Sequence, residues 1–335
     1  MRTVEITAED IRSIEAILME LANTYSSISD HLLAQLAAVY AHELPRRLRA
    51  SLNDYRILEQ DSALSIRGFF VNDNALGSTP TNWVTRETSA ARLRCEFFLL
   101  LCAALLGDPI SWETQQHGKF MHDLVPIRDH EGYQINSSSV NRLTWHTEDA
   151  SQSYFADYLL FMCLRNPQRV ATRLSSIADV RLNEATRQLL FEHDFAMQRD
   201  LANQGSPTPE MASTLSSGTG AMNRPIRARV LFGNHKSPYV RLDSYFIDVE
   251  SVEPDVSVAL NELLAEFERH ASDVILTPGD VLVIDNYRTV HGREPFVAAY
   301  DGTDRWLKRI SVARSLRAFR ATSQDVDQQR ASSDR

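Results

Sequence analysis

Short runs of β-forming residues dominate the chain after residue 118, and they constrain its fold more than any other feature. Apolar and β-branched residues gather at 140–146, 154–163, 228–232, 239–246, 274–276, 281–284 and 306–314. Many short strands in succession are typical of a β-sandwich or barrel. Residues 256–270 carry apolar side chains at helical spacing, so one helix is expected to pack outside the sheets.

The first 110 residues have a different pattern, because most of their apolar residues recur at helical spacing. We predict two or three helices in 7–49, where Thr7 and Asp10 resemble a capping box. A short strand is expected at 66–71. A strongly apolar helix is expected at 89–106, ended by the Gly-Asp-Pro sequence that follows it. This part is therefore predicted to be a mainly helical scaffold.

Two segments lack such periodicity. Residues 203–225 hold many Gly, Ser, Thr, Pro and Met residues, which is typical either of a lid loop over a site or of a passive surface insertion. Residues 321–335 are nearly all polar and are predicted to form a disordered tail. We therefore predict one domain over 1–320, with its β core in 111–320.

The charge balance excludes two classes of partner. The chain has 35 Lys and Arg residues against 44 Asp and Glu residues, a net charge of -9, so neither nucleic acid nor an anionic membrane surface is an expected partner. No stretch approaches the apolar length of a membrane span or a signal core. Cys95, Cys102 and Cys163 show no metal or disulfide spacing, which favours free thiols and a cytoplasmic location.

The candidate chemistry begins with His146 and Glu148. Two residues apart on a strand, their side chains point to the same side and can converge on one ion. With a distant histidine, His291, they would form the facial triad that suits Fe(II) and leaves coordination positions open. The His-x-Glu pattern alone is weak, because it occurs by chance in many proteins.

The residues around His291 strengthen this hypothesis. Residues 276–286 form a turn and an apolar strand that leads toward His291. Arg305 and Arg309 follow, and being four apart on a strand they share a face. A guanidinium clamps a carboxylate through two hydrogen bonds, so a buried arginine near the iron is the expected anchor for the distal carboxylate of 2-oxoglutarate. The alternative for each arginine is a surface salt bridge.

Taken together, residues 143–150, 157–166, 285–293 and 301–309 resemble the clavaminate synthase-like Fe(II)/2-oxoglutarate oxygenases, in particular the hydroxylases of free arginine, asparagine and lysine. The resemblance implies a mainly β protein with flanking helices, whose core is a double-stranded β-helix, the cupin-like jelly roll. It implies Fe(II), 2-oxoglutarate and O₂ as cofactor and cosubstrates. It places His146, Glu148 and His291 on the iron and Arg305 on 2-oxoglutarate.

The same resemblance suggests further binding residues. Thr172 falls where the family makes a second contact to the 2-oxoglutarate carboxylate, although a hydroxyl at a helix start is the alternative. Arg309 matches the position that binds the α-carboxylate of the substrate. Gln115 matches the glutamine that holds the α-amino group, unless Gln116 takes that role, and the free oxygen of Glu148 is a second candidate partner for the ammonium.

Selection of the substrate side chain is expected to involve Asp243 and Tyr245. The arginine and lysine hydroxylases use two acids, Asp-x-Asp, and here tyrosine stands in place of the second. One carboxylate and a phenol leave lysine, asparagine, glutamine, citrulline and modified arginines open, with lysine preferred by a small margin. A carrier-bound amino acid and a homodimer also remain open.

Four other functions are compatible with parts of this pattern. A halogenase would lack the carboxylate ligand, whereas Glu148 is present. Desaturation differs from hydroxylation only after the C–H bond is broken, so it stays open. A non-catalytic jelly-roll binding protein would not need all three ligands and both arginines, and a zinc hydrolase would have no use for Arg305.

Overall fold

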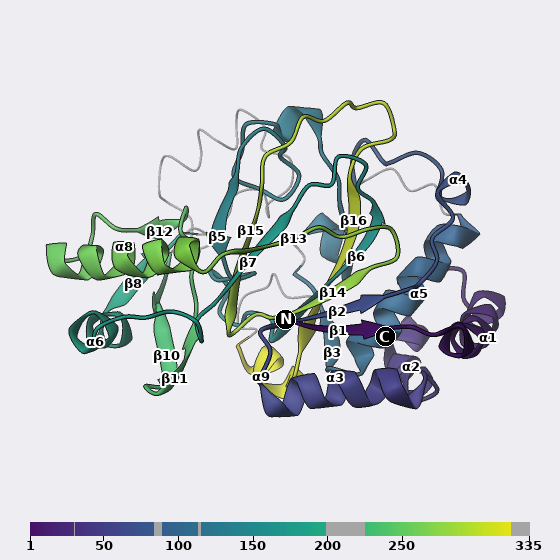
Figure 1. The fold of residues 1–335 in the computed structure, drawn as a ribbon, viewed down its shortest axis with the longest axis horizontal. Helices are drawn as coiled ribbons and strands as arrows, with labels where there is room; N and C mark the ends of the chain where they lie inside the picture. Colours follow the sequence, from purple (N-terminus) through teal and green to yellow (C-terminus); the bar gives the residue numbers. More distant parts are fainter. Residues whose placement is uncertain (30, 84–88, 113–114, 199–224, 323–335) are drawn as a thin grey trace.

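The computed structural model describes residues 1–29, 31–83, 89–112, 115–198 and 225–322. Two sheets form its centre (Figure 1). The larger sheet has the strand order β1 (Arg2–Glu5), β2 (Ala63–Arg67), β14 (Val281–Asp285), β6 (Tyr158–Arg165), β16 (Trp306–Ala313) and β3 (Asp108–Ile110), with β4 (Met121–Leu124) also paired to β16. The smaller sheet has the order β13 (Ser272–Val274), β7 (Thr172–Ser176), β15 (Thr289–Arg293) and β5 (Leu143–His146).

Apolar side chains from both sheets share one buried cluster, which includes Leu159, Leu174 and Leu282. Successive side chains of a β-strand point to opposite faces, so every second residue of each sheet can pack against the other sheet. The central strands β6 and β14 are buried along nearly their whole length. Two facing sheets with a shared core are what the predicted jelly roll requires.

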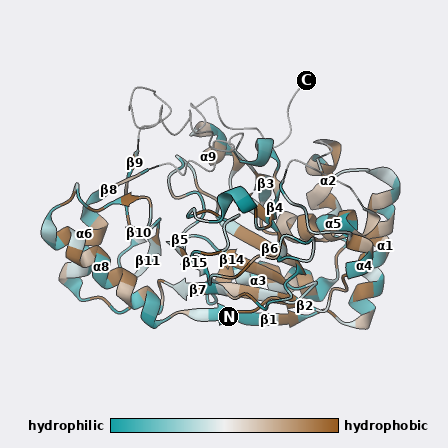
Figure 2. Ribbon diagram, turned by 90° about the horizontal axis from the view of Figure 1, so that it is seen from above, coloured by the Kyte–Doolittle hydropathy of each residue, from teal (hydrophilic) through white to brown (hydrophobic). Residues whose placement is uncertain are grey.

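Helices cover the outer face of the larger sheet, at the right and along the bottom of Figure 1. They are α1 (Ala8–Thr24), α2 (His31–Ala41), α3 (Arg46–Leu58), α4 (Asp73–Leu76) and α5 (Ala90–Ala104). The predicted capping box at Thr7 and Asp10 is present at the start of α1, and Ser89 caps α5. Figure 2 shows hydrophobic residues concentrated on the central strands and on the helices that pack against them. The helical scaffold is thus confirmed.

A smaller lobe packs beside the smaller sheet, at the left of Figure 1. It contains α6 (Glu184–Glu192), β8 (Asp194–Met197), β9 (Ile226–Arg229), β10 (Leu231–Asn234), β11 (Ser237–Val240), β12 (Ile247–Asp248) and α8 (Pro254–Arg269). Its core includes Trp145 from β5 and Val290 from β15. Both strands that carry the candidate histidines therefore pack against this lobe.

Several predicted boundaries were wrong. The run at 228–232 belongs to two strands that break at Val230, and the run at 239–246 is a strand only to Val240. The strand expected at 66–71 begins at Ala63 and ends at Arg67, and with β1 it joins the larger sheet, so the first 110 residues are not purely outer scaffold. Strands β7 and β15 were not anticipated, because their many polar residues do not alternate with apolar ones.

The lid predicted at 203–225 lies outside the described residues except for its last position, and so does the tail after residue 322. The last described helix, α9 (Leu316–Ala321), reaches the predicted domain boundary at residue 320, and the boundary itself stays a prediction. The three cysteines are buried and free, as expected. Within the described ranges, no helix is both long and apolar enough to cross a membrane.

Candidate active site

The three candidate iron ligands meet where β5 and β15 pair. His146 and His291 lie directly opposite each other in this antiparallel pair, with ring centroids 4.2 Å apart. Glu148, two residues beyond His146, points to the same side, and its Oε2 is 3.7 Å from Nε2 of His291. One ligand atom from each of the three residues lies within 4.8 Å of the others. The predicted cluster is therefore present.

The approach of β5 to β15 depends on Gly292. A Cβ at this position would lie 2.5 Å from the carbonyl oxygen of Leu143, far inside contact distance. The register also shifts between His291 and Arg293, so a β-bulge sits beside the ligand. Nδ1 of His146 is 2.8 Å from the carbonyl oxygen of Thr144 and donates to it, which leaves Nε2 with its lone pair for a metal.

A fully buried amide holds the backbone of Glu148. Oδ1 of Asn286 accepts the N–H of Glu148 at 2.8 Å, and its Nδ2 donates to the carbonyls of Glu148 and Ala156 at 3.1 and 2.8 Å. Asn286 follows β14 and has no exposed surface. Sequence reasoning included Asn286 in a motif but assigned it no role, because its partners lie more than 100 positions away.

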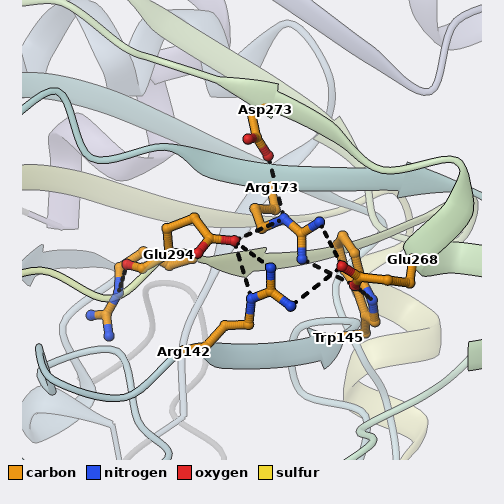
Figure 3. Close-up of polar contacts among 7 residues, drawn as sticks. Arg142, Trp145, Arg173, Glu268, Asp273 and Glu294 are labelled. Atoms are coloured by element: carbon orange, nitrogen blue, oxygen red, sulfur yellow. Dashed lines mark hydrogen bonds and ion pairs between the residues drawn. The ribbon is translucent and has the colours of Figure 1, made fainter.

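A network of charged residues ties the other side of β5 to the smaller lobe (Figure 3). Arg173 of β7 donates to both oxygens of Glu268 on α8 at 3.0 Å and lies over the ring of Trp145. The indole of Trp145 also donates to Glu268, at 3.2 Å. Arg142 pairs with Glu268 and Glu294 from the other side. The residue before His146 is thereby held by two elements that are distant in sequence.

The cluster has the properties of a metal site. Nδ1 and Nε2 of His291 and Oε2 of Glu148 are buried and have no hydrogen-bond partner among the described residues, whereas buried polar atoms normally have one. Burial and the neighbouring His146 lower the pKa of His291 to about 4. Burial opposes ionisation of Glu148, but the guanidinium of Arg309 holds its pKa well below its usual range. A neutral imidazole and a carboxylate are the forms that bind Fe(II).

Arg305 lies just before β16, as predicted, and is buried. Its Nη2 is 3.5 Å from Oγ1 of Thr172 on β7, and its Nε has no partner in the described part of the chain. Burial lowers the pKa of Arg305 to about 10, so the guanidinium stays charged at neutral pH. The structure therefore brings together the two residues expected to hold 2-oxoglutarate, and a carboxylate would satisfy both.

Arg309 lies on the triad side of β16. Its Nη1 forms an ion pair with Oε1 of Glu148, and its Nη2 is 3.4 Å from Oε1 of Gln115. Nη2 also donates to Nδ1 of His122 at 2.7 Å. Burial, and then the charge of Arg309, lower the pKa of His122 to about 3, so this imidazole is a neutral acceptor. No sequence pattern had singled out His122.

The two candidate glutamines have different surroundings. Gln115 reaches Arg309 and the carboxylate of Asp149, whose Oδ1 accepts from its Nε2 at 2.5 Å. Gln116 instead makes two hydrogen bonds to the backbone of Asp123. This placement supports Gln115 as the residue that faces the substrate, and its role remains a prediction.

A cavity opens beside the triad, and its lining, as far as the described residues form it, contains three carboxylates, from Glu148, Asp149 and Asp243, and no Lys or Arg. Asp243 pairs with His146 through an isolated β-bridge. One oxygen of Asp243 accepts the backbone N–H groups of Tyr245 and Phe246, and burial raises the pKa of its carboxyl. Tyr245 lines the same cavity but is 58% exposed. The structure thus brings Asp243 and Tyr245 together at this cavity, with Asp243 partly buried and the phenol exposed, and their role in binding stays a prediction.

Comparison with known proteins agrees with this site. Residues 96–311 match the family described as taurine catabolism dioxygenase TauD, TfdA family. The chain is 40% identical to enduracididine beta-hydroxylase from Streptomyces hygroscopicus over 96% of both chains. It is 37% identical to L-ornithine/L-arginine 3-hydroxylase from Catenulispora acidiphila, over 96% of this chain and 97% of that one. The chain belongs to the TauD/TfdA family of dioxygenases.

Among solved structures, the chain resembles the non-heme iron oxygenase OrfP in complex with Fe, succinate and (3S)-hydroxy-L-Arg. The TM-score is 0.86 at 34% identity, covering 96% of this chain and 97% of that one. OrfP has also been solved with Fe and alpha-ketoglutaric acid, which is 2-oxoglutarate, with a TM-score of 0.82. The predicted resemblance, the jelly-roll fold and the assignment as an Fe(II)/2-oxoglutarate amino acid hydroxylase are thereby confirmed.

These findings define what each part of the site contributes. His146, Glu148 and His291 would hold the iron, which together with 2-oxoglutarate and O₂ would supply the oxidising power that C–H hydroxylation needs. The protein contributes position and exclusion of water. Arg305 is placed to hold the far end of the cosubstrate, while Arg309 and Gln115 lie behind Glu148 and Asp149, which line the cavity.

Proposed function

We propose that this enzyme hydroxylates a free L-amino acid with a cationic, guanidinium-type side chain. The observation that carries the proposal is the lining of the cavity next to the triad, where the described residues contribute three carboxylates and no Lys or Arg. Such a cavity favours a positively charged ligand. Two relatives described above support the same substrate class, because one is named for hydroxylation of enduracididine and the other for hydroxylation of ornithine and arginine.

The amino-acid end of the substrate would lie between Arg309 and Gln115. A guanidinium and an amide oxygen 3.4 Å apart match a carboxylate and an ammonium carried by one carbon atom. On binding, the substrate carboxylate would compete with Glu148 for Arg309 and leave Glu148 to the metal. The zwitterion would thus be oriented with its side chain toward Asp243.

The side-chain end favours a planar group over an ammonium. A lysine ammonium directs three donors tetrahedrally and needs several acceptors, but Asp243 is the carboxylate at this position and the second acid of the Asp-x-Asp pair is Tyr245. A guanidinium can pair with one carboxylate through two parallel hydrogen bonds and stack on a phenol ring. We therefore propose arginine or a modified arginine as the substrate, in place of the lysine that the sequence favoured by a small margin.

A panel of amino acids tests this proposal. After anaerobic reconstitution with Fe(II), the enzyme receives 2-oxoglutarate, ascorbate and air with L-arginine, L-ornithine, L-lysine, L-asparagine or L-citrulline. We expect succinate and a product heavier by one oxygen atom with L-arginine, and little product with L-citrulline, its neutral isostere. Equal turnover of these two, or a clear preference for asparagine, would overturn the assignment of a cationic substrate.

The variant Asp243→Asn gives a sharper comparison. It keeps the shape of the side chain and its acceptor for the two backbone N–H groups, but it removes the charge that a guanidinium needs. We expect the preference for L-arginine over L-citrulline to fall about 10- to 150-fold, the factor for one hydrogen bond to a charged group. An unchanged preference would show that the side chain is read elsewhere.

We further propose one catalytic domain that ends near residue 320 and a lid formed by 203–225. The acidic net charge of -9 favours a small-molecule substrate over nucleic acid or membrane partners. The three free cysteines favour a cytoplasmic location. A homodimer stays open as the assembly. Light scattering of the purified protein tests the dimer, and limited proteolysis with and without substrate tests closure of the lid.

A further inference from the structure

We propose that Asp149 is a positioning residue that fixes the amide of Gln115 and thereby makes the site selective for the α-amino group. This inference rests on the proposed function, because it assumes that Gln115 and Arg309 receive the zwitterionic end of an amino acid. Asp149 directly follows the metal ligand Glu148 in the sequence, and its side chain lines the same cavity.

The backbone at Asp149 is unusual. Its φ is 59°, in the left-handed region that non-glycine residues rarely adopt and that aspartate and asparagine tolerate better than most. This conformation lets Glu148 and Asp149 both contribute side chains to the cavity although they are neighbours in the chain. Asp149 is only 8% exposed, so its carboxylate is aimed inward at a cost in solvation.

The chemistry of its neighbours fixes the orientation of Gln115. An ionised carboxylate can only accept hydrogen bonds and a guanidinium can only donate them. Gln115 lies between Asp149 and Arg309, so its amide must turn the NH₂ toward Asp149 and the oxygen toward Arg309. The reverse orientation would face donor with donor and acceptor with acceptor. The amide oxygen is therefore presented on the side where the substrate carboxylate would bind.

This orientation decides which substrates fit. An amide oxygen beside Arg309 accepts a hydrogen bond from an α-ammonium, whereas an amide NH₂ there would repel it. The second oxygen of Asp149, Oδ2, is buried without a partner among the described residues, although the indole of Trp112 lies nearby. That oxygen adds negative potential to the cavity next to the place where the ammonium would sit.

A purely structural role for Asp149 would have a different consequence. Its backbone carbonyl accepts the N–H of Gln152, so the turn itself does not need the carboxylate. If the side chain only supported the fold, its removal would lower turnover of every substrate by the same factor. If it orients Gln115, its removal should weaken substrates with an α-amino group and spare analogues without one.

The experiment compares L-arginine with 5-guanidinopentanoic acid, which lacks only the α-amino group. Selectivity is the ratio of the two kcat/KM values, or of KM to the inhibition constant where the analogue is not turned over. Asp149→Gly removes the side chain without straining a positive φ. Asp149→Asn retains an oxygen that can accept from Gln115, and Gln116→Ala removes a matched glutamine that bonds only to backbone in the described structure.

We expect Asp149→Gly to lower the selectivity about 10- to 150-fold, the factor for one hydrogen bond to a charged group. Asp149→Asn should keep most of it, and Gln116→Ala should leave it unchanged. Gln115→Met should lose as much as Asp149→Gly, and the double variant should lose no more than either alone, because both changes remove one interaction. The KM for 2-oxoglutarate should stay constant throughout.

Three results would contradict the proposal. They are an unchanged ratio in Asp149→Gly, an unchanged ratio in Gln115→Met, and losses that add in the double variant. The Gln115→Met result keeps the test valid if Asp149→Gly does not fold. Wild-type enzyme that turns over neither L-arginine nor any other amino acid would refute the proposed function itself, and this inference with it. Wild-type enzyme that accepts both compounds equally would refute the inference alone.

Discussion

Strand β16 carries two buried charged clusters, one on each face, and they differ in how their polar atoms are satisfied. On one face Lys308 contacts Glu96 at 2.6 Å and Asp123 at 2.5 Å, and the indole of Trp306 donates to Asp123 at 2.7 Å. On the other face Arg309, the next residue, lies beside the metal ligands. Lys308 and Arg309 are equally buried, at 0% and 4% exposure.

The two clusters differ in their number of buried polar atoms without a hydrogen-bond partner, and this difference indicates their roles. The side chains of Lys308, Glu96 and Asp123 have no unpaired buried atom in the described structure, and they link α5 to strands β4 and β16. The opposite side has unpaired buried atoms on His122, Glu148, Asp149, His291, Arg305 and Arg309. Buried polar atoms without partners are costly, so a protein keeps them where a ligand will satisfy them. On β16, the face whose charges are all paired thus belongs to the scaffold, and the face with unpaired atoms belongs to the site.

The largest effect expected from this comparison is on the scaffold side. Lys308→Met leaves Glu96 and Asp123 buried without their cation, so we expect the free energy of unfolding to fall by about 3–5 kcal/mol. Glu148→Gln is the matched change on the other face: it should abolish turnover, and it should destabilise the metal-free protein less than Lys308→Met does, because Arg309 keeps its contacts with Gln115 and His122. Urea unfolding measures both. Equal losses of stability would remove the distinction between the two clusters.

The second prediction concerns a buried carboxyl that belongs to neither cluster, Asp285 at the end of β14. Burial raises its pKa to about 7, against the attraction of Arg288. A carboxyl whose pKa is raised by folding stabilises the protein below the pKa of the unfolded chain, and this contribution is lost as pH rises through the folded value. Wild-type stability should therefore fall between about pH 4 and 7, by at most about 4 kcal/mol.

Asp285→Asn should remove this dependence, because an amide can still accept the N–H of Tyr287 without ionising. We expect the variant and the wild type to differ little at pH 4.5 and the variant to be more stable at pH 8. Thermal unfolding at both pH values measures the difference. A variant that is less stable than wild type at pH 8 would mean that Asp285 is ionised and needed as an anion.

The third prediction concerns the unpaired buried atoms on the site face of β16. Fe(II) should bind unpaired atoms of His291 and Glu148. At a free Fe(II) concentration 100 times the dissociation constant, the metal should therefore stabilise the folded protein by about 2.7 kcal/mol. Anaerobic thermal unfolding with and without Fe(II) measures this. The stabilisation should persist in Gln116→Ala and disappear in His291→Ala. Stabilisation of His291→Ala by the metal would place the iron elsewhere.

The smallest of these effects is expected at the cosubstrate anchor. Arg305→Lys keeps the charge but loses the two-point clamp, so we expect the KM for 2-oxoglutarate to rise about 10- to 150-fold with little change in stability. Thr172→Val should raise it less, because a neutral hydroxyl contributes a weaker hydrogen bond. A change in the KM for the amino acid instead would exchange the roles of Arg305 and Arg309.

The metal ligands could be predicted from the sequence because they depend on local rules. Two residues on one strand point to the same side, so His146 and Glu148 needed only a third ligand, and the apolar run before His291 indicated a strand nearby. The arginines followed from the chemistry of carboxylate binding. The helix after Thr7 was predictable because a capping box is a contact between residues three positions apart. The helix after Ser89 was predictable from its long apolar run.

Other features depend on contacts between residues that are distant in sequence. Asn286 holds Glu148 across 138 positions, and His122 meets Arg309 across 187, so neither partnership has a local signal. Strand β15 was missed because Thr289–Arg293 is rich in polar residues, which are buried because they serve the site. The orientation of Gln115 depends on a left-handed backbone at Asp149, which no sequence pattern predicts.

The most direct test of the central claim is turnover under ¹⁸O₂ with Fe(II), 2-oxoglutarate and L-arginine. If His146, Glu148 and His291 hold iron for a dioxygenase reaction, one labelled oxygen atom should appear in succinate and the other in the hydroxylated amino acid. Both labels should vanish in Glu148→Gln. Label in succinate without any in an amino acid would support the oxygenase but contradict the substrate. A hydroxylated product formed without consumption of 2-oxoglutarate would contradict the account as a whole.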